Sequence, residues 1–247
     1  MEIPHLERRE EFEEVLKDYH VSLEAQAILA KAHMVLLIAP TAIGRNTIIN
    51  ELVKTGRYHF IITDTTRPPR VNSGILERNG VEYFFRGEDD MLDDLKHGRF
   101  VEAAIIHNQQ VSGLSVREVE KADKQVKIAI TDIEIVGTEN VMRAKPSAVA
   151  IFVLPPSFDE WLRRLTMRNP TMTTDEMRRR LTSAIKEFTV ALNREYYRFI
   201  VNDDLQQAVK EVDEIVRLGR TDQVAQNRAL ALARTLLSQT EEWLAAE

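Results

Sequence analysis

The chain contains no cysteine, and this absence excludes disulfides, thiolate chemistry and cysteine-based zinc sites. It also lacks any apolar run approaching the ~20 residues that a membrane-spanning helix needs. The first residues, MEIPHLERREEFEE, are acidic and polar, unlike a signal peptide. A formal net charge of −6 argues against a protein that coats nucleic acid, because phosphate backbones attract basic surfaces. We therefore expect a cytoplasmic protein that has neither a membrane nor a nucleic acid as its partner.

The length and composition are those of a globular protein. With 247 residues the chain can form one sizeable core or two small domains. Hydrophobic residues make up 44% of the chain and charged residues 29%, both ordinary values for such proteins.

Apolar stretches typical of buried strands alternate with helical stretches along most of the chain. The expected strands cover residues 34–39, 59–63, 126–133, 148–154 and 198–201. The expected helices cover residues 7–32 in two pieces broken near 20–22, then roughly 45–56, 157–167, 173–196, 204–218 and 221–246. Capping boxes open two of these helices, at Ser157-x-x-Glu160 and Thr173-x-x-Glu176. Strands separated by helices predict an α/β fold in which a parallel sheet carries helices on both faces.

Residues 66–115 differ in character from the rest. They contain prolines, glycines and short β-like runs such as Val81–Phe85 and Phe100–His107, interrupted by an acidic helix at 88–97. We interpret them as a small β-rich lobe inserted into the α/β domain.

Residues 34–47, MVLLIAPTAIGRNT, are the most informative stretch. They read as a buried strand, a tight turn and the start of a helix, with residues placed where G-x-x-x-x-G-K-[ST] would put them. Such a loop binds phosphate because backbone N–H groups converge at a helix N-terminus beside a cation. Gly44 is retained, while Ala39 and Ala42 replace glycines, Arg45 replaces the lysine and Asn46 the hydroxyl residue. Taken alone, the stretch is equally consistent with a strand–turn–helix junction that binds nothing.

Other charged clusters have a structural as well as a functional interpretation. Thr65-Thr66-Arg67-Pro68-Pro69-Arg70 holds two guanidiniums on a proline-stiffened segment suited to phosphate, or forms a solvated basic turn. Glu102 lies among apolar residues, so it either points outward or has a donor partner such as a purine. Asp132 and Glu134 end an apolar strand, where they would share one face and either bind Mg²⁺ or ligand hydroxyls, or cap the strand.

Arginines bracket a polar break at residues 168–173. Two helices joined by a polar connector form a plausible lid, and arginines on a lid can close over phosphates and exclude water. We expect Arg163, Arg178 and Arg179 to lie on exposed helix surfaces, without a role in the site.

The order of these motifs resembles the guanylate kinase family. The phosphate loop, TTRPPR, E-x-x-G-x-x-YFF, FVEAA, DIE, FVLPPS, the lid and IVNDDL follow one another at compatible spacing over residues 33–218. The resemblance implies a P-loop kinase-like fold in which the lobe at 66–115 binds GMP and the lid spans 164–180. Residues 1–32 and 219–247 lie outside it, as an N-terminal helical extension and a C-terminal helix through which the chain could form a homo-oligomer.

The resemblance implies an enzyme that transfers the γ-phosphoryl group of ATP to GMP, with Mg²⁺ as the cofactor of ATP. Its catalytic cations would be Arg45, Arg164, Arg168 and Arg180. Its ATP site would comprise Ala39, Pro40, Thr41, Ala42, Ile43, Gly44, Arg45, Asn46, Thr47 and, near the adenine, Asn202. Its GMP site would comprise Thr63, Arg67, Arg70, Glu77, Tyr83, Glu102, Ser115, Asp132 and Glu134. Asn46 and Asp132 would contact the metal ion.

The sequence departs from the family in the phosphate loop and in one strand of the lobe. The family's N-Y-Y-G-[ST]-S is here Gln109–Ser115, so a phosphate-binding tyrosine is missing. Leu114 cannot supply the hydroxyl that helps to read guanine, and Ser112 or Ser115 would have to substitute. A binding module that recognises a nucleotide or a phosphorylated partner, with impaired catalysis, is the alternative hypothesis.

Overall fold

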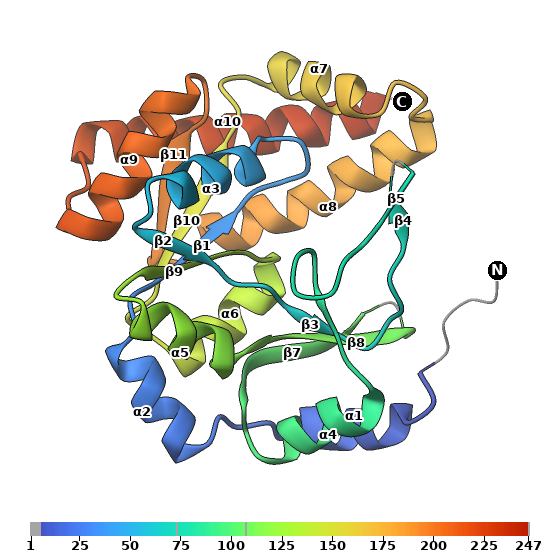
Figure 1. Ribbon diagram of the computed structural model, residues 1–247. Helices are drawn as coiled ribbons and strands as arrows, with labels where there is room; N and C mark the ends of the chain where they lie inside the picture. Colours follow the sequence, from blue (N-terminus) through green and yellow to red (C-terminus); the bar gives the residue numbers. More distant parts are fainter. Residues whose placement is uncertain (1–5, 73, 107, 247) are drawn as a thin grey trace. The chain divides into compact units, whose positions relative to one another are not determined.

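The computed structural model describes residues 6–72, 74–106 and 108–246 (Figure 1). The chain divides into two compact units. Unit 1 takes in the described residues up to Met34, together with Tyr58–Thr131 and Glu139–Ala148. Unit 2 comprises Val35–Arg57, Asp132–Thr138 and the chain from Val149 onward.

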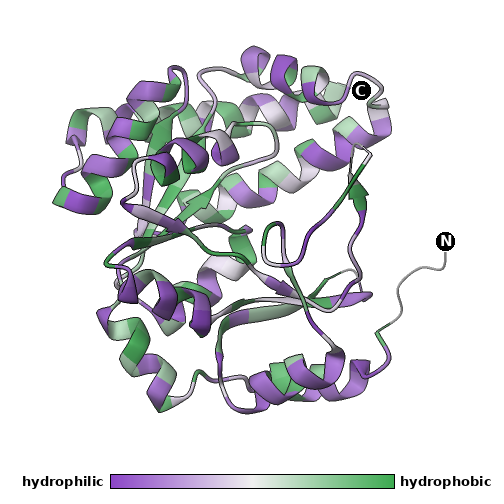
Figure 2. Ribbon diagram, viewed as in Figure 1, coloured by the Kyte–Doolittle hydropathy of each residue, from purple (hydrophilic) through white to green (hydrophobic). Residues whose placement is uncertain are grey.

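Unit 2 is built on three parallel strands in the spatial order β11-β10-β1. These strands are β1 (Met34–Ile38), β10 (Val149–Leu154) and β11 (Tyr197–Val201). All of β1 is buried, as is β10 after its first residue, and Figure 2 colours both as hydrophobic. Strands buried on both faces are near-continuous apolar runs, which is why these segments were recognisable from sequence.

Five helices accompany these strands. They are α3 (Arg45–Lys54), α7 (Phe158–Arg168), α8 (Thr174–Leu192), α9 (Leu205–Leu218) and α10 (Gln223–Ala246). The two predicted caps are confirmed, since Ser157 and Thr173 each accept a hydrogen bond at 3.2 Å from the N–H three residues later. Phe152 packs against Phe188 and Phe199 with ring centroids 5.6 and 5.5 Å apart, which forms an aromatic core around β10.

The C-terminal helix α10 is part of unit 2. It packs against α8 and β11, and its Ala229, Ala233 and Leu236 are buried. The side chain of Gln226 accepts a hydrogen bond at 3.0 Å from the backbone N–H of Phe199 on β11. The apolar face of this helix is therefore covered within the chain, and assembly through the terminal helices stays a prediction.

Unit 1 contains a four-stranded sheet in the order β6-β3-β8-β7, a two-stranded hairpin β4-β5 and the parallel pair β2-β9. Its strands are β2 (Tyr58–Phe60), β3 (Asp64–Thr65), β4 (Val71–Asn72), β5 (Ile75–Leu76), β6 (Phe84–Phe85), β7 (Phe100–Ile106), β8 (Gln110–Ser115) and β9 (Ile128–Asp132). Its helices are α1 (Arg9–Lys17), α2 (Leu23–Lys31), α4 (Glu88–Lys96) and α5 (Val116–Lys124), with part of α6 (Ile135–Ala144).

The N-terminal residues share a core with the inserted lobe. Leu6 and Phe12 are buried together with Leu92 of α4, Phe100 of β7 and Val111 of β8. Helices α1 and α2 therefore pack as part of unit 1.

The α/β class with parallel strands is confirmed, but several local expectations were wrong. The expected strand Val81–Phe85 is reduced to Phe84–Phe85, and α5, α6 and the hairpin β4-β5 were not foreseen. Strand β9 ends at Asp132, so Glu134 lies outside it and the argument that both acids share a strand face fails. His107, residues 1–5 and residue 247, which fell within predicted segments, lie outside the described residues. Among the described residues, no helix has the length and apolarity to cross a bilayer.

Candidate functional site

The loop that is predicted to bind phosphate lines a cavity in unit 2. Its volume is 570 Å³, within the ~300–1,000 Å³ common for small-molecule sites. The lining residues are Ala39, Pro40, Thr41, Ala42, Ile43, Gly44, Arg45, Asn46, Thr47, Asp132, Arg164, Arg168 and Arg180. Four of the predicted catalytic cations, from three separate segments, thus face one cavity at the N-terminus of α3.

The loop has the backbone that a phosphate site needs, although it has lost glycines. Ala42 has φ 70° and Gly44 has φ 96°, both in the left-handed region. Gly44 is required for a second reason, because a Cβ there would lie 2.5 Å from Nδ2 of Asn202. At Ala42 the backbone is in a left-handed conformation that costs an L-residue about 1–2 kcal/mol, whereas glycine adopts it freely.

Side chains from other elements hold the loop through its carbonyl groups. Trp161 Nε1 donates to the Thr41 carbonyl at 2.9 Å, and Asn202 Nδ2 donates to the Ile43 carbonyl at 2.7 Å. Arg164 reaches the Ile43 carbonyl at 3.4 Å and the Asn202 carbonyl at 3.0 Å. These bonds occupy loop carbonyl groups and not the N–H groups of Ala42–Asn46, whereas the Thr47 N–H donates to the Gly44 carbonyl at 3.0 Å. The predicted contact of Asn202 with adenine stays a prediction.

Arg45 forms an ion pair with Asp132. Its Nη2 lies 3.0 Å from Oδ2 of Asp132, and its Nη1 donates to the Ile133 carbonyl at 3.3 Å. Both side chains are about three-quarters buried. A phosphate entering the cavity would therefore share this guanidinium with the carboxylate.

The lid arginines differ in whether they form ion pairs. Arg164 pairs with Glu160, and Arg180 pairs with Glu176 on the next helix. The two arginines beside Glu160 hold the pKa of its carboxyl well below the usual range, at about 2. Arg168 is exposed and forms no ion pair with the described residues, which leaves its charge available to a ligand.

One arginine was assigned wrongly from sequence. Arg178 was expected to be an exposed surface side chain of its helix. Its Nη2 instead donates to the Leu244 carbonyl at 3.1 Å, near the end of α10. It is partly buried and joins α8 to the C-terminal helix, so its role is structural.

In unit 1 the predicted phosphate-binding arginine Arg67 is buried and paired. Its two terminal nitrogens lie 2.5 and 3.0 Å from the two carboxylate oxygens of Glu77. Its guanidinium carbon is 4.7 Å from the ring centroid of Tyr83. Glu77 also accepts a hydrogen bond from the Arg70 backbone at 2.8 Å. Arg67, Glu77 and Tyr83, which were predicted to hold or border the monophosphate, therefore form one cluster. Glu77 also fixes the backbone at Arg70.

Comparison with known proteins decides the family. A family model described as guanylate kinase matches residues 31–218. The guanylate kinases of Corynebacterium diphtheriae and Sulfurimonas denitrificans are each 33% identical over 189 residues, 76% of this chain and 95% and 88% of those proteins. The chain belongs to the guanylate kinase family. A guanylate kinase structure from Anaplasma phagocytophilum shares the fold, with a TM-score of 0.55 at 22% identity over 84% of this chain and 97% of that one.

Membership of the guanylate kinase family confirms the P-loop kinase-like fold and makes the protein a nucleoside monophosphate kinase by descent. Gly44 and Arg45 line the loop cavity, and the binding of an anion there stays a prediction.

The loop cavity of this guanylate kinase relative has oxygen donors suited to Mg²⁺. Asn46 offers an amide oxygen and Asp132 a carboxylate, and both line the cavity. Mg²⁺ prefers oxygen ligands and commonly uses one or two protein carboxylates, with water and substrate phosphates completing its shell. The donor set therefore fits a nucleotide-borne metal ion. Among the described residues no group of three or more acidic or histidine side chains is placed to hold a metal alone.

Sequence reasoning missed Gln110 as a candidate site residue. Its Oε1 accepts a hydrogen bond from Arg70 at 3.4 Å, and its Nε2 lies 3.4 Å from Oγ1 of Thr65 and 3.2 Å from Oγ of Ser112. It stands in the segment where the family's tyrosine pair is replaced. The signal was present, because a polar residue replaces a phosphate-binding one beside a predicted phosphate arginine.

The remaining lobe residues have different surroundings. Ser115 is buried, and its hydroxyl has no hydrogen-bond partner among the described residues. Leu114 is 1% exposed and apolar. Thr63 accepts a hydrogen bond from the Phe84 N–H through its backbone carbonyl, at 2.9 Å. Because the Ser115 hydroxyl is fully enclosed, it is poorly placed to replace the family hydroxyl that reads guanine.

A carboxylate near the loop was also overlooked. Glu187 on α8 is largely buried, and burial raises the pKa of its carboxyl to about 7. The charge of Arg45 acts in the opposite direction, and that of Glu134 in the same direction. Glu134 itself is exposed and starts α6 through its backbone carbonyl, which accepts from Thr138 N at 2.9 Å.

Proposed function

We propose that this protein transfers the γ-phosphoryl group of ATP to GMP, giving ADP and GDP. The observation that carries the proposal is the gathering of Arg45, Arg164, Arg168 and Arg180 around the loop cavity. Phosphoryl transfer needs positioning and charge neutralisation rather than covalent chemistry from the protein. Four guanidiniums beside a helix N-terminus meet that need.

The loop backbone and the charged side chains of the loop cavity have separate tasks in this proposal. The N–H groups of Ala42–Asn46 bind the β- and γ-phosphates of ATP, and Arg45 neutralises these phosphates in place of the usual lysine. Arg164 fixes the loop through the Ile43 carbonyl while presenting charge to the phosphates. Arg168 approaches the transferred group. Asn46 and Asp132 would hold Mg²⁺, which supplies charge neutralisation at the phosphates when bound.

In unit 1, Arg67 and Arg70 bind the phosphate of GMP, with Tyr83 beside Arg67 and Gln110 beside Arg70. The two hydrogen bonds from Arg67 to the Glu77 carboxylate fix the position of the Arg67 guanidinium. Thr63, Asp132 and Glu134 are assigned the GMP contacts that the family resemblance implies, whereas the enclosed Ser115 hydroxyl is not. Nothing in the described residues favours the alternative of a binding module, and a cytoplasmic location is part of the proposal.

The test is turnover with matched arginine variants. Purified protein is given ATP, Mg²⁺ and GMP, and ADP formation is followed. Arg168→Ala should lower kcat by at least tenfold, because it removes a charge aimed at the transferred phosphoryl group. Arg163→Ala is the control, since Arg163 is exposed on the same helix and, among the described residues, bonds to Glu160 and Met167. Equal losses in both variants, or no turnover by the unchanged protein, would contradict the proposal.

Arg45 provides a second test of the same site. Arg45→Ala should lower turnover far more than GMP affinity, because the residue belongs to the ATP side. Parallel losses in kcat and in GMP binding, measured by steady-state kinetics and calorimetry, would show that its role is not the proposed one.

A further inference from the structure

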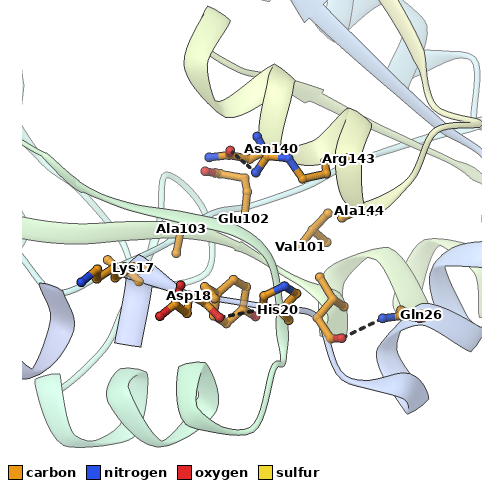
Figure 3. Close-up of a pocket in the computed structure, with 13 residues that line it drawn as sticks. Lys17, Asp18, His20, Gln26, Val101, Glu102, Ala103, Asn140, Arg143 and Ala144 are labelled. Carbon is orange, nitrogen blue, oxygen red and sulfur yellow. Dashed lines mark hydrogen bonds between the residues drawn. The ribbon is translucent and has the colours of Figure 1, made fainter. Parts of the chain in front are cut away.

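The cavity that Glu102 lines in unit 1 is not a new site. Figure 3 shows the Glu102 carboxylate on the same side of that cavity as the side chains of Asn140 and Arg143 on α6. Glu102 already belongs to the predicted GMP site, and its contact with guanine stays a prediction. A cavity in unit 2, by contrast, has no part in the proposed function.

This cavity, which we call the α10 cavity, lies beside the edge strand β11 and is lined from within residues 192–199 and 219–234. The end of α8, the first half of β11, the connection between α9 and α10, and one side of α10 meet there. Its volume is 740 Å³, within the ~300–1,000 Å³ common for small-molecule sites. Of the described residues, none lines both this cavity and the loop cavity. Its lining residues from Gly219 onward lie beyond the family match, which ends at residue 218.

Arginines give the α10 cavity an excess of positive charge. Its described lining includes Arg194, Arg198 and Arg234 but a single acidic residue, Glu195. Arg198 and Arg234 are exposed and form no ion pair with any other described residue. Arg198 Nη1 donates to the Glu195 backbone carbonyl at 3.3 Å, a contact that involves one end of its guanidinium. A guanidinium donates hydrogen bonds and accepts none, so this lining favours an anion.

A buried amide adds a directed donor to the α10 cavity. Gln226 is 8% exposed and lines the cavity from α10. Its Oε1 accepts from the Phe199 N–H at 3.0 Å, and because a backbone N–H can only donate, this contact fixes the orientation of the amide. Its Nε2 makes no hydrogen bond within the described part of the chain. This nitrogen is therefore a donor available at the cavity wall.

The N-terminus of α10 is already capped from within the chain. Oδ1 of Asp222 accepts from the Val224 N–H at 2.8 Å and from the Ala225 N–H at 3.2 Å. A carboxylate at this end offsets the positive end of the helix dipole. The donors for an anion in the α10 cavity are therefore side chains.

These side chains are spread along the cavity. Arg234 follows Gln226 by eight residues on one helix, which corresponds to about 12 Å of helix axis. Arg198 projects from a different element, the strand β11. A single phosphate ion presents its oxygens over a few ångströms, whereas linked phosphates extend further. The spacing of the donors therefore suits a ligand with two or more linked phosphates.

We propose that the α10 cavity binds the phosphate groups of a small molecule with two or more linked phosphates, either free pyrophosphate or a nucleoside diphosphate. Arg198 and Arg234 bind phosphate oxygens from β11 and α10, and Gln226 Nε2 donates from the buried wall. The site is separate from the phosphoryl transfer proposed above, because it uses a different cavity of unit 2.

The test is hydrogen–deuterium exchange of the full chain, read peptide by peptide during a titration with inorganic pyrophosphate. Peptides that cover residues 219–234 should become protected, and the protection should saturate. Arg198→Gln and Arg234→Gln should each weaken this binding by about tenfold or more, because hydrogen bonds from charged donors are lost. Arg228→Gln is the matched control and should bind like the unchanged protein, since Arg228 is an exposed arginine of the same helix outside the described lining.

Two results would overturn the proposal. One is the absence of saturable protection at residues 219–234. The other is an equal loss of affinity in Arg228→Gln and Arg234→Gln, which would show that pyrophosphate responds to the general charge of α10. The substituted arginines are exposed, so the variants should fold, and urea denaturation checks that they do.

Orthophosphate and ADP separate the candidate ligands. Orthophosphate should bind about tenfold more weakly than pyrophosphate, because it cannot contact donors spread along α10. Equal affinities of these two ions would overturn the requirement for linked phosphates. ADP that binds more tightly than pyrophosphate would identify a nucleotide as the source of the diphosphate, and ADP that binds equally or more weakly would identify free pyrophosphate.

The same experiment separates this inference from the proposed function. Peptides that cover residues 39–47 report on the loop cavity. Protection at residues 219–234 without protection at 39–47 would contradict the proposed phosphate loop and support the α10 site. Protection at 39–47 alone would leave the proposed function intact and overturn the inference.

Discussion

At the scale of single residues, the phosphate loop shows how a fold survives unfavourable substitutions. Ala42 occupies a left-handed conformation that glycine, the usual residue at this position of the motif, would adopt freely. Bonds from Trp161 and Asn202 to the loop carbonyls keep the conformation in place. The strain is local and should be measurable.

Ala42→Gly should stabilise the protein by about 0.5–1 kcal/mol. The gain is the relief of left-handed strain of about 1–2 kcal/mol, less the greater chain entropy of glycine in the unfolded state. The free energy of unfolding from urea denaturation measures it. Val126→Gly is a matched control, because Val126 has φ 55° and is 94% exposed, far from any predicted site residue. Stabilisation by Val126→Gly together with destabilisation by Ala42→Gly would show that the Ala42 methyl group makes a contact that offsets its strain.

Residue types predicted some pairings and missed others. The family resemblance implied that Arg67, Glu77 and Tyr83 lie around one phosphate, and the structure brings the three side chains together. Gln110 was not foreseen beside Arg70, because that contact joins the segment before β4 to the start of β8, forty residues later. Pairings set by sheet register are beyond what a single sequence reveals.

At the scale of elements, α8 carries a titratable group that the sequence did not single out. The carboxyl of Glu187 has a folded-state pKa of about 7, above its usual value near 4.5, mainly because it is buried. The folded protein therefore binds a proton more tightly than the unfolded chain. This group stabilises the fold fully below about pH 4.5, and the contribution is lost as the pH rises through 7.

Glu187→Gln should have a free energy of unfolding similar to the unchanged protein at pH 5 and a higher one at pH 8. The amide stays neutral, so it avoids the burial of a charge. Urea denaturation at the two pH values measures the difference, with Glu241→Gln, an exposed glutamate of α10, as the control. An identical pH dependence in all three proteins would contradict a buried, proton-binding Glu187.

Helix α10 should be integral to unit 2 despite lying beyond the family match. Gln226→Ala removes the acceptor for the buried Phe199 N–H and should destabilise the protein by about 1–3 kcal/mol. Gln223→Ala, at the exposed start of the same helix, is the comparison and should change stability by less than ~0.5 kcal/mol. Indistinguishable stabilities would mean that α10 adds nothing at this edge.

The long elements were predictable and the short ones were not. Strands β1 and β10 and helices α7, α8 and α10 have continuous apolar or helical patterns and capping residues, and all were recognised. Strands β3, β4 and β5 have two residues each, too few to show a period. Helix α5 was missed because polar and charged residues dominate it: its buried face rests on Val116, Val119 and Ala122.

At the scale of the whole molecule, the account depends on ordered motifs rather than on any one of them. The phosphate loop alone was ambiguous, and so was the pair of arginines beside the prolines. The order of the motifs over residues 33–218 predicted the family, which the comparisons confirmed for residues 31–218. The packing of the two terminal segments could not be predicted from sequence: α1 shares a core with the lobe, and α10 bonds to the edge strand β11.

The most direct measurement of the central claim follows the phosphorus atom itself. The protein is incubated with GMP, Mg²⁺ and ATP labelled at the γ-phosphate, and the products are separated. We predict labelled GDP that increases in step with ADP, and its loss in Arg168→Ala but not in Arg163→Ala. Label found only in inorganic phosphate, or retained in ATP while GMP binds, would contradict a phosphoryl transfer to GMP.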